Sequence, residues 1–165
     1  MAPACEIQRG DYLLSDDPAR LQVEAIHAYL TTSYWAAGIP RGTVERALAN
    51  SLCIGAYLAN RTQVGLARFV TDSATFCYVC DVYVVEEHRR KGIAPAMLAL
   101  AVRHPRLQGL RRWNLVTADA HGLYAPFGFK VPAAPERYME RLDPDVYRRM
   151  AGTGQLPGTS ESPGR

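Results

Sequence analysis

The sequence has no hydrophobic run that approaches the length of a membrane span. A spanning helix needs about 20 consecutive apolar residues, so we expect no membrane partner. The first residues, Met1–Glu6, also lack the basic and apolar regions of a signal peptide. A cytoplasmic location is therefore the default expectation.

A strong excess of one charge is absent as well, because the 165 residues carry a net charge of only +3. Residues 1–82 have 6 basic and 8 acidic side chains, whereas residues 83–165 have 13 and 8. A basic second half favours a polyphosphate ligand, and it is also typical of a solvated surface or of weak nucleic-acid binding. Few aromatic residues accompany the arginines, so we expect no nucleic-acid partner.

Cysteine is scarce, and the four that occur are Cys5, Cys53, Cys77 and Cys80. The spacing of Cys77 and Cys80 is found in zinc sites, but such a site needs a second pair or histidines at short spacing. The pair also lies in a strand-like segment, where residues three apart face opposite sides. We therefore expect free thiols and no metal.

The most informative segment runs from Asp81 to Leu100. A β-branched strand leads into a charged loop and a glycine, and an apolar helix follows. A helix start leaves N–H groups unpaired and carries partial positive charge, so it binds anions. Gly92 permits a close backbone approach, and Ala94 keeps that approach clear. Three cationic side chains precede the glycine: Arg89, Arg90 and Lys91. Together these residues predict a pyrophosphate site.

This loop resembles the signature of the GNAT superfamily, whose members transfer an acyl group from acyl-CoA to an amine. The family motif, Gln/Arg-x-x-Gly-x-Gly/Ala, is matched at every specified position between Arg89 and Ala94. The resemblance implies that the loop binds the pyrophosphate of acetyl-CoA, the co-substrate, and that the preceding strand hydrogen-bonds its pantetheine arm. The binding residues that it implies are Val82, Tyr83, Val84, Arg89, Arg90, Lys91, Gly92, Ile93 and Ala94.

A second block, residues 118–129, resembles the Tyr-x-x-x-Gly-Phe ending of the same family. Tyr124 and Gly128-Phe129 fill its specified positions. The resemblance, which covers roughly residues 5–142, implies that Tyr124 is the general acid. Many relatives have an asparagine seven residues before this tyrosine, where this chain has Thr117.

Hydrophobic periodicity and turn residues give the expected order of elements. Strands are expected at residues 7–14, 52–58, 64–70, 75–85, 113–118, 129–131 and 137–142. Helices are expected at residues 18–31, 44–50, 93–104 and 123–127. The strand after the third helix should lie parallel to the one before it, through a right-handed crossover.

This order predicts an α+β fold with a GNAT-like, mixed, mostly antiparallel central sheet and helices on both faces. We expect residues 1–150 to form one domain. Residues 151–165 are rich in Gly, Pro, Ser and Thr, so we expect a flexible C-terminal tail.

The attack of an amine on a thioester requires a neutral amine, yet a free alkyl ammonium has a pKa of about 10.4. Asp81 is the candidate that orients the ammonium or accepts its proton, with a structural pairing to an arginine as the alternative. His121 is a second candidate for proton transfer, with a local hydrogen bond as the alternative. A phenol is protonated at neutral pH, so Tyr124 can protonate the leaving thiolate. Tyr34 and Trp35 either wall the acceptor pocket or pack in the core.

The favoured hypothesis is an acetyl-CoA-dependent N-acetyltransferase that moves an acyl group to a primary amine by direct attack in a ternary complex. The alternative is a non-catalytic acyl-CoA-binding sensor that regulates a partner. The acceptor is a small-molecule or peptide amine that the sequence does not name. A homodimer is also compatible with the sequence, since dimers are common among relatives.

Overall fold

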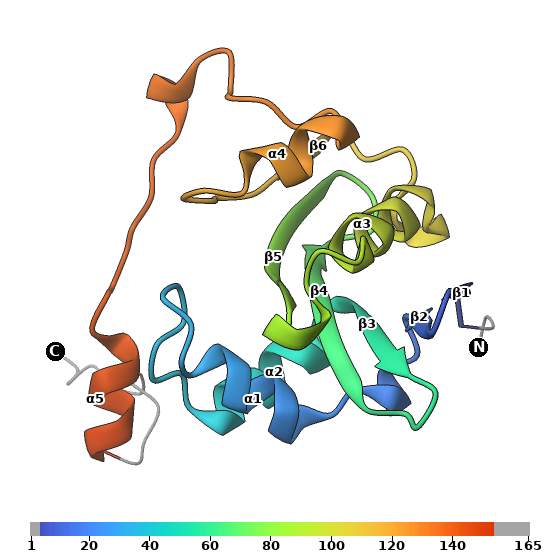
Figure 1. Ribbon diagram of the computed structural model, residues 1–165. Helices are drawn as coiled ribbons and strands as arrows, with labels where there is room; N and C mark the ends of the chain where they lie inside the picture. Colours follow the sequence, from blue (N-terminus) through green and yellow to red (C-terminus); the bar gives the residue numbers. More distant parts are fainter. Residues whose placement is uncertain (1–3, 154–165) are drawn as a thin grey trace, which may run out of the picture.

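The computed structural model describes residues 4–153 (Figure 1), which build one six-stranded sheet in the order β1-β2-β3-β4-β5-β6. Neighbouring strands are antiparallel except for β5 and β6, which are parallel. The predicted mixed, mostly antiparallel sheet is therefore confirmed. No helix in this part of the chain combines the length and apolar character needed to cross a bilayer.

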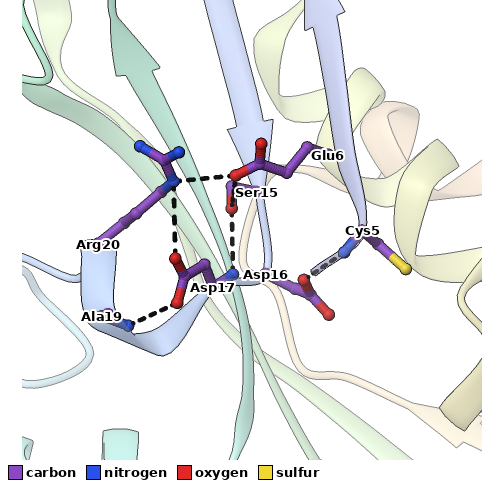
Figure 2. Close-up of polar contacts among 7 residues, drawn as sticks. All are labelled: Cys5, Glu6, Ser15, Asp16, Asp17, Ala19 and Arg20. Carbon is purple, nitrogen blue, oxygen red and sulfur yellow. Dashed lines mark hydrogen bonds and ion pairs between the residues drawn. The ribbon is translucent and has the colours of Figure 1, made fainter. Parts of the chain in front are cut away.

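The first segment of the sheet is a hairpin, β1 (Glu6–Arg9) and β2 (Tyr12–Ser15), rather than the single strand predicted over residues 7–14. The chain reverses at Gly10, whose φ of +55° suits a tight turn. A polar cluster fixes the hairpin to the chain that follows (Figure 2). The Glu6 carboxylate accepts hydrogen bonds from Ser15 Oγ at 2.8 Å and from Arg20 Nε at 2.9 Å.

The first helical segment begins as predicted, with Asp17 as N-cap and Pro18 in the first position. Asp17 Oδ1 accepts a hydrogen bond from the Ala19 N–H at 2.9 Å (Figure 2). The segment is nevertheless a short 3-10 helix, η1 (Pro18–Arg20), which is separate from α1 (Val23–Leu30). A loop then leads to α2 (Arg41–Ala49).

The centre of the sheet is the predicted meander of β3 (Leu52–Leu58), β4 (Gln63–Thr71) and β5 (Phe76–Val84). Alternate residues of β3 enter different cores, since Leu52 and Ile54 pack in one cluster and Cys53 in the other. The cluster of Leu52 also includes Ile93, Met97 and Leu98 of α3 (Ile93–Arg103). The opposite cluster contains the buried residues of α1 and α2, which are Ile26, Leu30, Val44 and Leu48. Helices therefore cover both faces.

A β-bulge in β5 changes which face of the sheet its alternate side chains occupy. Leu66 pairs with Tyr83 and Arg68 with Cys80, so one residue of β4 faces two of β5. The bulge includes Asp81, whose φ is +49°. Consequently Val79 packs on the α3 side of the sheet, whereas Tyr83 packs on the α1 side.

The C-terminal part differs most from prediction. β6 is shorter than expected (Arg112–Asn114), and α4 (His121–Tyr124) continues into the 3-10 helix η4 (Ala125–Phe127). The strands predicted at residues 129–131 and 137–142 are wrong, because that segment has only the short η5 (Pro135–Arg137). It runs extended to α5 (Val146–Thr153), which lies beside the loop between α1 and α2 (Figure 1).

The predicted domain boundary at residue 150 falls inside α5. The rest of the predicted tail, beyond Thr153, lies outside the described residues.

Candidate functional site

An opening in the sheet lies between β5 and β6. The two strands pair only where Phe76, Cys77 and Tyr78 face Arg112, Trp113 and Asn114. β5 continues for six more residues, to Val84, with no strand on that side in the described part of the chain. Backbone groups that β5 turns toward this side can hydrogen-bond a ligand, except the Val84 carbonyl, which accepts a hydrogen bond from Arg89 Nε. Val82, Tyr83 and Val84, which were predicted to bind pantetheine, belong to this stretch, which pairs with β4 on its other side.

The loop after β5 ends in a cluster of free backbone donors. Among the described residues, five consecutive N–H groups have no protein acceptor, and they belong to Arg90, Lys91, Gly92, Ile93 and Ala94. Two residues of the loop are left-handed: Arg90 has a φ of +59° and Gly92 a φ of +73°. The N-terminus of α3 adds partial positive charge at the same place. The sequence-predicted loop therefore has the geometry of an anion cradle.

Arg9, which the sequence reasoning did not single out, supplies a further cation. A Cβ added to Gly92 would lie 2.8 Å from a terminal guanidinium nitrogen of Arg9. This side chain comes from the β1–β2 hairpin, so a contact between distant parts of the chain brings it there. No local motif marks it in the sequence.

The three predicted cations have different surroundings. Arg90 and Lys91 are exposed beside the cradle. Arg89 instead turns back toward the sheet, where Nε donates to the Val84 carbonyl at 3.0 Å and a terminal nitrogen donates to Tyr29 Oη at 3.2 Å. Its guanidinium thus braces the loop against β5 and α1. His88 adds a second brace, since its Nδ1 lies 2.9 Å from Tyr12 Oη.

Tyr124 ends α4 and is only 8% exposed. Its ring meets Phe129 edge to face, with the centroids 5.9 Å apart. Burial, with smaller contributions from Tyr34 and Cys80, raises the pKa of Tyr124 to about 12. The phenol therefore stays protonated at neutral pH, as a proton donor must. Thr117, which stands at the asparagine position, accepts a hydrogen bond from the Ala120 N–H at 3.0 Å and so shapes the turn before α4.

Asp81 lies in the β5 bulge, with its side chain 11% exposed. One carboxylate oxygen accepts a hydrogen bond from Arg68 Nε at 2.7 Å and the other from Trp35 Nε1 at 3.1 Å. Burial acts to lower the pKa of the Arg68 guanidinium, but the Asp81 carboxylate, together with Cys80 and Cys53, acts to raise it, and the net shift is upward. The arginine pairing that was the structural alternative for Asp81 is thus present, and it holds the carboxylate in a fixed position.

Aromatic rings surround this ion pair. Trp35 meets Tyr34 edge to face at 5.0 Å, and both are exposed. Tyr29 stacks on Tyr83 at 3.7 Å. These rings form a wall on the α1 side of β5, next to Asp81. His121, the other candidate for proton transfer, is exposed at the start of α4.

Tyr147 of α5 also reaches this side of the sheet. It is half-buried and packs against the cluster of α1 and α2. Burial raises its pKa, with a further upward contribution from Asp81 and an opposing one from Arg68. Sequence reasoning missed Tyr147 because it placed the functional part of the chain before residue 142. The apolar spacing of residues 146–150 was the available signal.

One group of potential metal ligands lies elsewhere, where Cys5, Asp16 and His104 offer ligand atoms within 4.8 Å of one another. His104 Nδ1 accepts a hydrogen bond from the Arg106 N–H at 3.1 Å, so its proton is on Nε2. That nitrogen lies 2.8 Å from the Asp16 carboxylate and donates to it. Both ring nitrogens are thus engaged in hydrogen bonds. Burial raises the pKa of the Cys77 and Cys80 thiols to about 12.

Comparisons with known proteins agree with this geometry. A family model described as an acetyltransferase (GNAT) domain matches residues 50–131, which include both the cradle and Tyr124. A candidate acetyltransferase of Gibberella zeae is 38% identical over 138 residues, and the match covers 70% of this chain and 77% of that protein.

Solved structures show the same fold. A candidate GNAT-family acetyltransferase of Xanthomonas campestris pv. campestris is 42% identical, with a TM-score of 0.81, and the match covers 85% of this chain and 99% of that one. An acetyltransferase-like protein of Clostridium acetobutylicum, solved with acetyl-CoA, has a TM-score of 0.57 at 16% identity. That match covers 79% of this chain and 94% of the other, and it bears on the fold alone.

Proposed function

This chain belongs to the GNAT acetyltransferase family, and on that premise we propose that it is an acetyl-CoA-dependent N-acetyltransferase acting on a primary amine. The observation that carries the proposal is the set of five unpaired N–H groups from Arg90 to Ala94. A row of donors at the start of α3 suits a diphosphate, whose oxygens accept several hydrogen bonds at once. Arg9, Arg90 and Lys91 add positive charge beside it.

The substrate positions follow from this anchor. With its diphosphate in the cradle, the pantetheine arm of acetyl-CoA would run along Val82, Tyr83 and Val84, where β5 has no strand on its β6 side. Its thioester would then lie in the opening between β5 and β6. The amine would approach from the α1 side, past Tyr34 and Trp35.

We assign the proton steps to two residues. Asp81, held by Arg68 and Trp35, orients the ammonium and accepts its proton, either directly or through water. The neutral amine attacks the thioester carbonyl in a direct transfer. The tetrahedral intermediate then expels the CoA thiolate, which takes a proton from Tyr124. Burial keeps that phenol protonated until it is needed.

The cytoplasmic location stays a prediction.

The test is the release of CoA thiol from acetyl-CoA in the presence of a panel of primary amines. We expect turnover with at least one amine and a loss of about 100-fold or more in kcat for Tyr124→Phe between pH 7 and 9. Tyr57→Phe is the matched control, because Tyr57 is also buried and its hydroxyl has no partner among the described residues.

Unchanged turnover in Tyr124→Phe would remove Tyr124 as the acid. Tight acetyl-CoA binding without turnover on any amine would instead indicate the non-catalytic sensor.

A further inference from the structure

Two neighbouring aromatic side chains on the loop between α1 and α2 face solvent. Tyr34 is 71% exposed and Trp35 is 41% exposed, and their rings meet edge to face with centroids 5.0 Å apart. The Tyr34 hydroxyl makes no hydrogen bond within the described part of the chain. Exposed large apolar groups that lie together mark an interaction site, and aromatic rings supply much of the contact energy at such sites.

The loop holds these two rings in place before any ligand binds. Ser33 is buried, and its Oγ donates to the Leu30 carbonyl at 2.7 Å and accepts from the Ala36 N–H at 3.2 Å. The Gly38 N–H closes the loop by donating to the Thr31 carbonyl at 2.9 Å. A ligand that binds the rings therefore has little loop ordering to offset.

Trp35 joins this pair of rings to Asp81. Its Nε1 donates to one Asp81 carboxylate oxygen at 3.1 Å, so the indole lies directly beside the group that is proposed to hold the ammonium. Tyr29 continues the surface, with its ring 6.4 Å from that of Trp35 and stacked on Tyr83 at 3.7 Å. An acceptor whose ammonium lies at Asp81 thus has its substituent against aromatic rings.

The charges around these rings disfavour an acceptor with several ammonium groups. Asp81 is already paired with the Arg68 guanidinium at 2.7 Å, and a second guanidinium, that of Arg89, donates to Tyr29 Oη at 3.2 Å. Two cations thus accompany one carboxylate, and a further positive charge on the acceptor would be repelled.

A polyamine is the competing class of acceptor, because one more carboxylate lies on this side of the sheet. Burial raises the pKa of Tyr78, and Glu140 adds to that shift. Glu140 is exposed, however, so water screens its attraction for a second ammonium. The rings and the two guanidinium groups therefore favour a monoamine with an apolar, ring-bearing substituent.

We propose that the acceptor is an arylalkylamine, with its ammonium at Asp81 and its aromatic ring against Tyr34 and Trp35. The inference rests on the proposed function and names the acceptor class of that site. The new bond joins the amine nitrogen to the acetyl carbon, and the carbon–sulfur bond of the thioester breaks. The products are the N-acetylated amine, the CoA thiol and one proton, which leaves through Asp81 to water.

The first test measures the affinity of amines by calorimetry on the complex with CoA, which carries no acyl group to transfer. We expect phenethylamine to bind about 10-fold or more tightly than ethylamine and spermidine, because its ring is buried on the wall. It should also bind about 3-fold more tightly than hexylamine, an apolar amine without a ring. Equal or tighter binding of ethylamine, spermidine or hexylamine would overturn the proposal.

The second test asks whether the ring of Tyr34 sets this preference. The quantity compared is the ratio of the dissociation constants for ethylamine and phenethylamine. In Tyr34→Ser we expect the ratio to fall by about 5-fold, because the exposed ring is lost while Asp81 keeps its partners. Tyr34→Phe is the matched control, since it keeps the ring, and its ratio should stay within about 2-fold of the wild type. A ratio that is the same in Tyr34→Ser and the wild type would contradict the assignment.

The third test separates this inference from the proposed reaction by following CoA thiol release from acetyl-CoA with the same amines. We expect the highest kcat/KM for phenethylamine. A higher kcat/KM for spermidine or ethylamine would overturn the acceptor class and leave the N-acetyltransferase standing. Tight binding of phenethylamine without turnover of any amine would instead contradict the reaction and support the aromatic amine site.

Discussion

The body of the protein, residues 6–107, and its C-terminal region, residues 112–153, are held together in different ways. In the body, strands and helices enclose two apolar clusters that contain nearly all of the buried side chains. In the C-terminal region, Tyr124, at 8% exposed, is the only buried large side chain among the described residues, and the helices and strands are short. The comparison indicates that the body is held by many buried side chains, whereas the C-terminal region packs on it through Tyr124 and a few half-buried side chains.

The largest expected effect is on stability, and it contrasts one residue from each region. Phe69 is fully buried in β4, so Phe69→Ala should lower the free energy of unfolding by about 3–5 kcal/mol. Met139 is 97% exposed, so Met139→Ala should change it by less than about 0.5 kcal/mol. Urea denaturation at low protein concentration measures both. Similar losses of unfolding free energy for the two variants would contradict this contrast between the two regions.

A second pair of variants separates the binding role of the free N–H groups from the effect of ordinary backbone strain. Gly92 and Gly109 have φ values of +73° and +72°, but only Gly92 has a neighbour within 4 Å of an added Cβ. Gly92→Val should weaken acetyl-CoA binding by about 100-fold, which is roughly 2.7 kcal/mol, because the side chain displaces Arg9 and blocks the free N–H groups. Gly109→Val suffers the same strain and should keep its affinity in calorimetry. Equal losses of affinity in the two variants would show that backbone strain, and not the blocked N–H groups, weakens binding.

A third prediction concerns the one well-buried side chain of the C-terminal region. Tyr124 has a folded-state pKa of about 12, above the usual value of about 10. Between these pH values the unfolded chain ionises this phenol and the folded chain does not, so stability falls as pH rises. Below pH 10 the group has no such effect. Between pH 10 and 12, the free energy of unfolding of Tyr124→Phe should therefore fall by about 1–2 kcal/mol less than that of the wild type. Identical slopes of stability against pH for the variant and the wild type would refute the assignment.

The smallest effect is expected at Tyr57, in the body. Its ring lies over Gly55, and its buried hydroxyl has no hydrogen-bond partner among the described residues. Tyr57→Phe removes a desolvated polar atom, so the free energy of unfolding should stay the same or rise by up to about 1 kcal/mol. A clear loss of stability in thermal unfolding would show that the hydroxyl is bound to water or another partner.

The sequence was most informative where local signals decide the structure. Residues 52–58 form the strand that alternation predicted, and α3 ends before Pro105, where the proline stops it. The cradle was found from Gly92 and the helix start, because both act within a few residues. Gly10 was overlooked as a turn, so one strand was predicted where a hairpin forms.

The rest depends on contacts between distant residues. Arg9 reaches Gly92 only once β1 has joined the sheet, and Trp35 reaches Asp81 only across the α1–α2 loop. Residues 137–142 have the pattern of a strand, but a strand needs a partner, and no local pattern says whether the same chain supplies it. This is why the closing strands were predicted and are absent.

The central claim is that the backbone N–H groups from Arg90 to Ala94 bind the diphosphate of acetyl-CoA. The most direct measurement is a titration of ¹⁵N-labelled protein with acetyl-CoA, followed by NMR at each amide. We predict the largest shifts at these five amides, with the same shifts for CoA and little change at them in Gly92→Val. Binding that shifts amides elsewhere while these five stay unchanged would contradict the account.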